Sequence, residues 1–212
     1  MTPTRPAALL AAAALVLAPV LAGCSDGGDE PAAVSSSSSA PVKPTEAPVP
    51  DGTVRTASPV VVVDVGDGPV MCPARDAKAS NTCQPSIPIE GWDWSEQQDV
   101  SKAAGTKVGQ YVVTGTYDGS TFTAEKSVPA SKAPTDDATH AAPPPLRQYS
   151  ETDILDIADD VSGLPGVTGV VPLKDGQVLV DVVYDDGTLQ DWANTTYGEN
   201  VVVVSSTLVD AG

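Results

Sequence analysis

The sequence predicts an α+β protein in which a small antiparallel β lobe precedes a lobe with the element order αββαβ. Two observations support this class. Residues 58–130 hold short apolar and alternating runs bounded by glycine and proline, with no helical period. Residues 148–210 instead switch between helical and extended patterns. A folded part of about 150 residues is long enough to bury a core.

The first lobe is expected to consist of strands alone. The extended segments that the pattern indicates are residues 60–63, 87–94, 107–117 and 120–128. Asp118-Gly119 has the sequence of a two-residue type I′ turn between the last two of them. Such a lobe fits a small, partly open barrel or a sandwich, and residues 113–119 resemble a hairpin of the OB-fold.

The second lobe begins with a helix that Ser150 and Asp153 cap together. Its expected apolar stripe is Ile154, Leu155, Ala158 and Val161, and its expected stop is at Gly163 and Pro165. Strands over 167–173 and 178–184 follow, joined at Asp175-Gly176.

Thr188 and Asp191 are then expected to cap a second helix, whose buried face is Leu189, Trp192, Ala193 and Tyr197. Residues 201–204 are apolar on both faces, which predicts an interior parallel strand. The order αββαβ is similar to a ferredoxin-like pattern without its first strand. The first lobe would supply that strand, or the sheet would stay small.

The N-terminus carries a targeting signal. Arg5 is followed by an apolar run over residues 7–20, too short for a comfortable membrane span, and by Leu21-Ala22-Gly23-Cys24. This tetrad resembles the lipobox of bacterial lipoproteins. The resemblance implies removal of residues 1–23, a diacylglycerol and further acyl chains such as palmitate on Cys24, and attachment to the extracytoplasmic face of a cell membrane. The alternatives are an ordinary signal peptide and an uncleaved signal anchor.

Two segments are expected to be linkers. Residues 24–57 hold Cys24 and a Ser- and Pro-rich stretch with few large apolar side chains, which predicts a disordered tether. Residues 131–147 include several prolines and form a second linker between the lobes.

The charge balance limits the partners. The chain has 11 basic and 28 acidic residues, a net charge of −17, and residues 148–212 hold twelve acidic side chains against Lys174 alone, a net −11. Such a surface repels nucleic acid and other polyanions. The partners expected are the lipid bilayer, through acylated Cys24, and another protein of the cell envelope. A cation is a further alternative, although the plainest role of the charge is solubility.

The three cysteines are expected to have two different roles, one as a lipid attachment site and two as a disulfide. Cys24 is taken by the lipid, which leaves Cys72 and Cys83 as a pair in an oxidising compartment. A disulfide between them would stabilise the domain by about 3 kcal/mol on the chain-entropy model. A redox or metal site is the alternative, but the pair lacks the Cys-x-x-Cys spacing and a neighbouring histidine.

No catalytic constellation emerges, so the sequence predicts a protein that is not an enzyme and has no cofactor or metal. The only histidine, His140, lies in the second linker. The acids around Asp185-Asp186 lack the alternation of a calcium loop and fit a strand-to-helix turn better. Trp92 and Trp94, two apart in an extended segment, would face one side and bind a ligand or glycan together with Tyr111. Packing of both tryptophans in the core is the simpler alternative.

The leading functional expectation is therefore a membrane-anchored, extracytoplasmic, non-catalytic accessory module that acts through protein contacts. The alternative is a small-ligand or glycan binder that uses the Trp92/Trp94 face.

Replacement of the acylated residue tests the membrane address. Cys24→Ala removes the only thiol of the lipobox, so we expect the protein to leave the membrane fraction or to accumulate with its signal peptide attached. Fractionation of cells, with the apparent mass of the chain, measures this. Membrane retention of the variant at the processed size would contradict the lipoprotein assignment.

Overall fold

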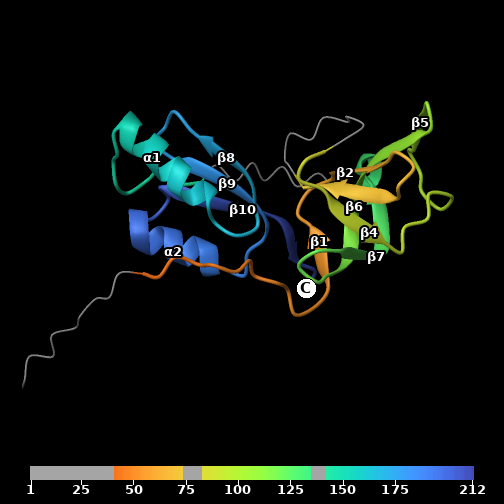
Figure 1. Ribbon diagram of the computed structural model, residues 1–212, viewed down its shortest axis with the longest axis horizontal. Helices are drawn as coiled ribbons and strands as arrows, with labels where there is room; N and C mark the ends of the chain where they lie inside the picture. The colour runs from red at the N-terminus through yellow and green to blue at the C-terminus, as the bar shows by residue number, and fades with distance from the viewer. Residues whose placement is uncertain (1–40, 74–82, 135–141) are drawn as a thin grey trace, which may run out of the picture. The chain divides into compact units, whose positions relative to one another are not determined.

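The strands that the structure describes form one sheet. The structure is a computed structural model that describes residues 41–73, 83–134 and 142–212. Within these residues the strand order is β2-β3-β4-β7-β6-β1-β10-β9-β8, with β5 also paired to β6 (Figure 1). The predicted signal peptide, Cys24, the first part of the tether and His140 lie outside the described residues.

The first lobe is a closed five-stranded barrel, whereas the sequence predicts a partly open barrel or a sandwich. Together with the two helices of the second lobe, it confirms the α+β class. Its strands are β2 (Val60–Asp64), β3 (Pro69–Cys72), β4 (Ile87–Glu90), β6 (Thr106–Tyr117) and β7 (Phe122–Pro129). The barrel closes because β2 pairs with both β3 and β6. The β4–β7 pairing is parallel. A short β5 (Ser101–Ala103) extends the β6 edge, and a 3-10 turn, η1 (Ala130–Lys132), follows β7.

The turn between β6 and β7 differs from the type I′ turn that the sequence predicts. Tyr117 pairs with Phe122, so the loop contains four residues, and only Gly119 among them has a positive φ. The Asp118 carboxylate accepts hydrogen bonds from the backbone N–H groups of Ser120 and Thr121, both at 2.8 Å. The aspartate side chain thus closes the wider loop, as Asx turns do.

The disulfide joins Cys72 at the end of β3 to Cys83. It lies on the outer face of the barrel against Val61, Val63, Val70 and Val108. This covering layer explains why all five residues of β2 are buried, although only alternate ones can face the barrel interior.

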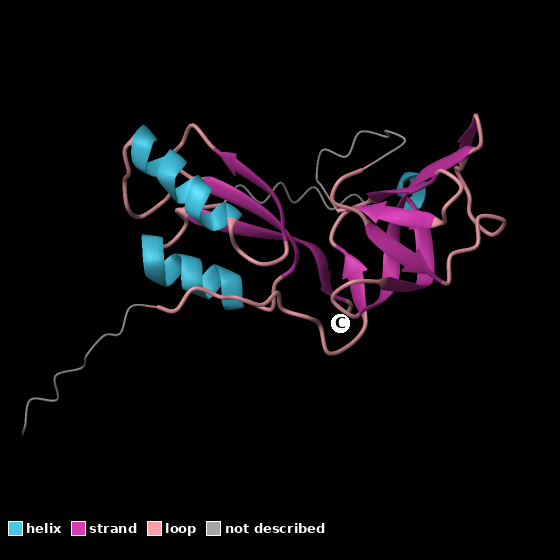
Figure 2. Cartoon of the chain, in the orientation of Figure 1, coloured by secondary structure: helices cyan, strands magenta, loops and turns pink. Residues whose placement is uncertain are grey.

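The second lobe has the predicted order of elements. These are α1 (Glu151–Ser162), β8 (Val167–Pro172), β9 (Val178–Tyr184), α2 (Thr188–Tyr197) and β10 (Val202–Asp210). Both helices pack on one face of the sheet, because alternate β9 residues, Val178, Val180 and Val182, share one core with them (Figure 2).

Two helix details require correction. The Ser150–Asp153 capping box forms as predicted, but Leu155 is 54% exposed and Ile157 is buried in its place. Ile157 lies three residues after Ile154 and four before Val161, which is the spacing of one helix face.

The second helix is capped by Asp185 and Asp186 instead of Thr188 with Asp191. Asp186 accepts from the Thr188 N–H at 3.0 Å, and Asp185 from the Leu189 N–H at 2.9 Å.

The ferredoxin-like pattern is not confirmed. β10 pairs directly and in parallel with β9, where a split βαβ unit would hold another strand between them. The strand that the N-terminal segment supplies, β1 (Val54–Thr56), lies instead on the other side of β10.

β1 joins the two lobes. Val54 pairs with Asp210 of β10 on one side and with Gly115 of β6 on the other. Val54 and Thr56 are fully buried, and the Thr56 hydroxyl accepts a hydrogen bond from the Val113 N–H at 3.2 Å. Tyr184 and Leu208 of the second lobe belong to the core of the barrel. The described residues accordingly belong to one compact unit.

The tether prediction is thus wrong for residues 54–56 and also for the strap segment, which we define as residues 41–50. Lys43 Nζ donates to the Asp160 carbonyl and carboxylate in α1, at 2.5 and 2.9 Å, and lies 5.7 Å from the Trp192 ring centre. Pro50 is buried. Composition averaged over 34 residues hides these local contacts, because prolines suit an extended strap as well as a disordered chain.

The end of the predicted second linker is likewise held by the second lobe. Gln177 Nε2 donates to the Pro143 carbonyl at 2.9 Å, and the Leu146 N–H donates to the Glu199 carbonyl at 3.2 Å. No helix in the described part of the chain is both long enough and apolar enough to cross a membrane.

Candidate functional site

The tryptophan pair lies in the loop that follows β4. β4 ends at Glu90, so Trp92 and Trp94 are not strand residues and do not face one side as the sequence predicts. Their ring centres are 5.6 Å apart and their planes make an angle of 77°. The pair is therefore an edge-to-face contact and not a coplanar platform.

Trp92 is the inner member of the pair. Its ring meets Tyr111 edge to face at 5.1 Å, and Tyr111 is fully buried in the barrel core. The Tyr111 hydroxyl donates to the Gln98 carbonyl at 2.7 Å, and burial raises its pKa. Tyr111 consequently packs against Trp92 from the barrel core, which corrects the expectation that it faces a ligand. Trp92 Nε1 is shielded and makes no hydrogen bond to any of the described residues.

Gly109 makes room for this support. A Cβ atom at Gly109 would lie 2.4 Å from the Tyr111 hydroxyl oxygen. The Tyr111 ring thus lies over the bare backbone of its own strand, and a side chain at position 109 would displace it.

Trp94 is the outer member and is held by Asp64. Trp94 Nε1 donates to Asp64 Oδ2 at 3.0 Å, and the Gly66 and Gly68 N–H groups donate to Asp64 Oδ1 at 2.8 and 3.3 Å. The Gly66 hydrogen bond is the main reason why the pKa of Asp64 is lowered. Asp64, which is 9% exposed, thereby connects the β2–β3 turn to the tryptophan loop as a carboxylate.

Two lysines stand beside Trp94. The β5–β6 hairpin pairs Lys102 with Lys107, and the β2–β6 pairing sets Lys107 opposite Asp64. Lys107 Nζ lies 3.6 Å from Asp64 Oδ2. The hairpin turns at Ala104-Gly105, where both residues have positive φ. The lysine pair could not be recognised from the sequence. Alanine rarely adopts a positive φ, so Ala104-Gly105 does not have the pattern of a two-residue turn.

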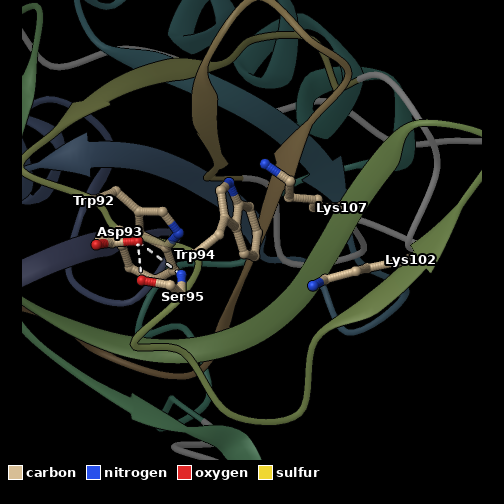
Figure 3. Close-up of a pocket in the computed structure, with 6 residues that line it drawn as sticks. All are labelled: Trp92, Asp93, Trp94, Ser95, Lys102 and Lys107. Atoms are coloured by element: carbon tan, nitrogen blue, oxygen red, sulfur yellow. Dashed lines mark hydrogen bonds between the residues drawn. The ribbon is translucent and has the colours of Figure 1, made fainter.

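The two tryptophans and the two lysines line an open cleft of about 410 Å³ together with Asp93 and Ser95. In Figure 3 the Trp94 indole stands between Asp93 and Ser95 on one side and the two lysines on the other. Asp93 accepts hydrogen bonds from the Ser95 hydroxyl and N–H, both at 2.7 Å, which lower its pKa. The cleft thus has an aromatic wall with opposite charges at its two ends.

The acidic cluster of the second lobe has a structural role. The Asp185 and Asp186 oxygens are engaged by the first N–H groups of α2, as the strand-to-helix interpretation predicts. Among the described residues no group of three or more His, Cys, Asp or Glu is placed to hold a metal ion.

Comparison of the chain with protein-family models, with curated proteins and with solved structures gives no match.

The depressed pKa of Asp64 predicts a pH-dependent contribution to stability. A carboxylate whose pKa is lowered on folding stabilises the fold above its unfolded pKa of about 3.9 and loses that effect as the pH falls through the folded value. We expect Asp64→Asn to lower the free energy of unfolding at pH 7 by about 1.5–3 kcal/mol.

That difference should shrink only below about pH 4, where the wild-type carboxylate is protonated. Urea unfolding of both proteins from pH 7 to pH 3 measures it, and Asp67→Asn, in the same turn, is the matched control. A difference that is constant over this range would contradict the assigned role of the charge.

Proposed function

We propose that the protein is a membrane-anchored extracytoplasmic lipoprotein whose barrel binds a small ligand or glycan in the cleft beside Trp94. It acts by binding and not by catalysis. The lipobox at Leu21-Ala22-Gly23-Cys24 supports the address. The cleft between Trp94 and the two lysines carries the proposal for the ligand.

The organisation of the cleft supports binding more than core packing. Trp94 is only half-buried, so part of its ring is open to the cleft, and the hydrogen bond to Asp64 fixes the ring in a single orientation. A pre-oriented aromatic face costs little conformational entropy when a sugar ring packs on it. The volume of the cleft suits one or two sugar rings.

We further propose that the barrel is OB-like. Five strands, a closed β2–β6 pairing and a chain that passes from β4 to β6 before it returns as β7 support this assignment. OB barrels bind oligosaccharides and oligonucleotides with loops that include the one between their first two strands. In this barrel that loop holds Gly66 and Gly68, which fix Asp64 at the edge of the cleft. The net charge of −17 favours the saccharide over the nucleic acid.

A second candidate is the accessory module that binds another envelope protein. The sheet face opposite the helices carries a cross-strand apolar row of Val171, Leu179 and Val203. Val171 is 45% exposed, and β8 is the outermost strand of the sheet in the described part of the chain. A partner with an apolar surface would cover this row.

Loss of the aromatic wall tests the proposed ligand site. We expect cellotetraose to quench the tryptophan fluorescence of the wild type, and Trp94→Ala to weaken its binding about tenfold, because one stacking contact is worth roughly 1.4 kcal/mol. Fluorescence titration measures the dissociation constants.

Tyr149→Ala is the control, since it removes a half-buried aromatic ring of the second lobe. Melting curves of both variants separate a lost contact from a lost fold. Equal affinity of Trp94→Ala and the wild type, or no binding by a folded wild type, would refute the glycan site and favour the protein-binding candidate.

A further inference from the structure

The lysine pair at the cleft is an unfavourable arrangement for the free protein. Lys102 and Lys107 are direct cross-strand neighbours, and like charges in that position are destabilising. The chain has 11 basic residues against 28 acidic ones, yet two of the 11 face each other here. A local conflict of this kind at a cleft points to function.

The charges nearby resolve the conflict for Lys107 but not for Lys102. Asp64 lies 3.6 Å from Lys107 and forms an ion pair with it, while its oxygens also accept hydrogen bonds from Trp94, Gly66 and Gly68. Lys102 forms no ion pair with any residue that the structure describes. Asp93 is bound by Ser95 and stands on the other side of the Trp94 ring, and the charge of Lys107 contributes to its lowered pKa (Figure 3). Lys102 is thus the member of the pair with the capacity for one more anionic group.

We propose that the ligand of this cleft is an acidic sugar, a ring that packs on Trp94 and places its carboxylate between Lys102 and Lys107. This inference rests on the proposed glycan-binding function and adds the charge of the ligand to it. A carboxylate accepts charge-assisted hydrogen bonds from both ammonium groups and removes their repulsion. Asp93 at the other end of the cleft repels a second anion and accepts from ring hydroxyl groups, so the arrangement fixes the direction of the sugar.

A pair of sugars that differ only in the carboxylate provides the test. Cellobiouronate (β-D-glucuronosyl-1,4-D-glucose) and cellobiose share one backbone, and only the first has a carboxylate, a single one at C6. At low salt, where screening is weak, we expect the wild type to bind cellobiouronate about tenfold more tightly than cellobiose. Lys102→Gln should abolish this preference, whereas Lys174→Gln, in the β8–β9 turn, should preserve it. Calorimetric titration measures all six combinations of the three proteins with the two sugars.

The ligand-free protein gives an independent readout. Because Lys102→Gln removes the cross-strand repulsion, its melting temperature should rise above that of the wild type while its affinity for cellobiouronate falls. A mere structural defect would lower both quantities. A melting temperature that falls would overturn the proposal that the lysine pair is strained for the sake of an anion.

The remaining outcomes separate the two proposals. Equal binding of both sugars by the wild type would overturn the acidic-sugar inference and leave the glycan-binding function standing. Binding of neither sugar would overturn both. Competition by inorganic phosphate as strong as that by cellobiouronate would overturn the assignment to a sugar, because the anion alone would then be recognised.

Discussion

The constraint on which the structure depends is the double pairing of β1. A strand of only three residues, Val54–Thr56, lies between β6 of the barrel and β10 of the second lobe and contributes buried side chains to both. Two lobes of about 70 residues would each be marginal alone, because small domains bury a low fraction of their surface. β1 makes their sheets continuous, and Tyr184 and Leu208 extend one core across the join. Folding of either lobe is therefore coupled to the other.

The candidate site depends on this continuity through β6. β6 pairs with β1 near Gly115 and with β2 and β5 nearer its start, and there it sets Lys107 between Asp64 and Lys102. Asp64 in turn holds the Trp94 ring, while Tyr111 of β6 supports Trp92 from inside the barrel. The cleft is thus made by loops, but the core of the barrel fixes its geometry. Such support on rigid strands is what a binding site needs to keep its orientation.

The sequence predicts the elements of this fold better than their arrangement. The β6 alternation, the capping box at Ser150 and the order αββαβ are local patterns, so one sequence suffices to find them. The role of β1 is not local. Its three residues are surrounded by proline, serine and glycine, and only the pairing with distant strands identifies them as the centre of the sheet. The same holds for the site: the spacing of Trp92 and Trp94 is visible in the sequence, whereas the bond from Trp94 to Asp64, 30 residues away, is not.

Native-state hydrogen exchange of Thr56→Val tests the coupling of the lobes most directly. The substitution keeps the shape of the side chain and removes the acceptor of the buried Val113 N–H. The account predicts that the slowest amides of β6 and of β9 lose the same opening free energy, about 1–3 kcal/mol, while the control Thr53→Val at an exposed position changes neither by more than about 0.5 kcal/mol. A loss confined to the β6 amides, with β9 unchanged, would show that the second lobe is stable without the barrel and would contradict the account.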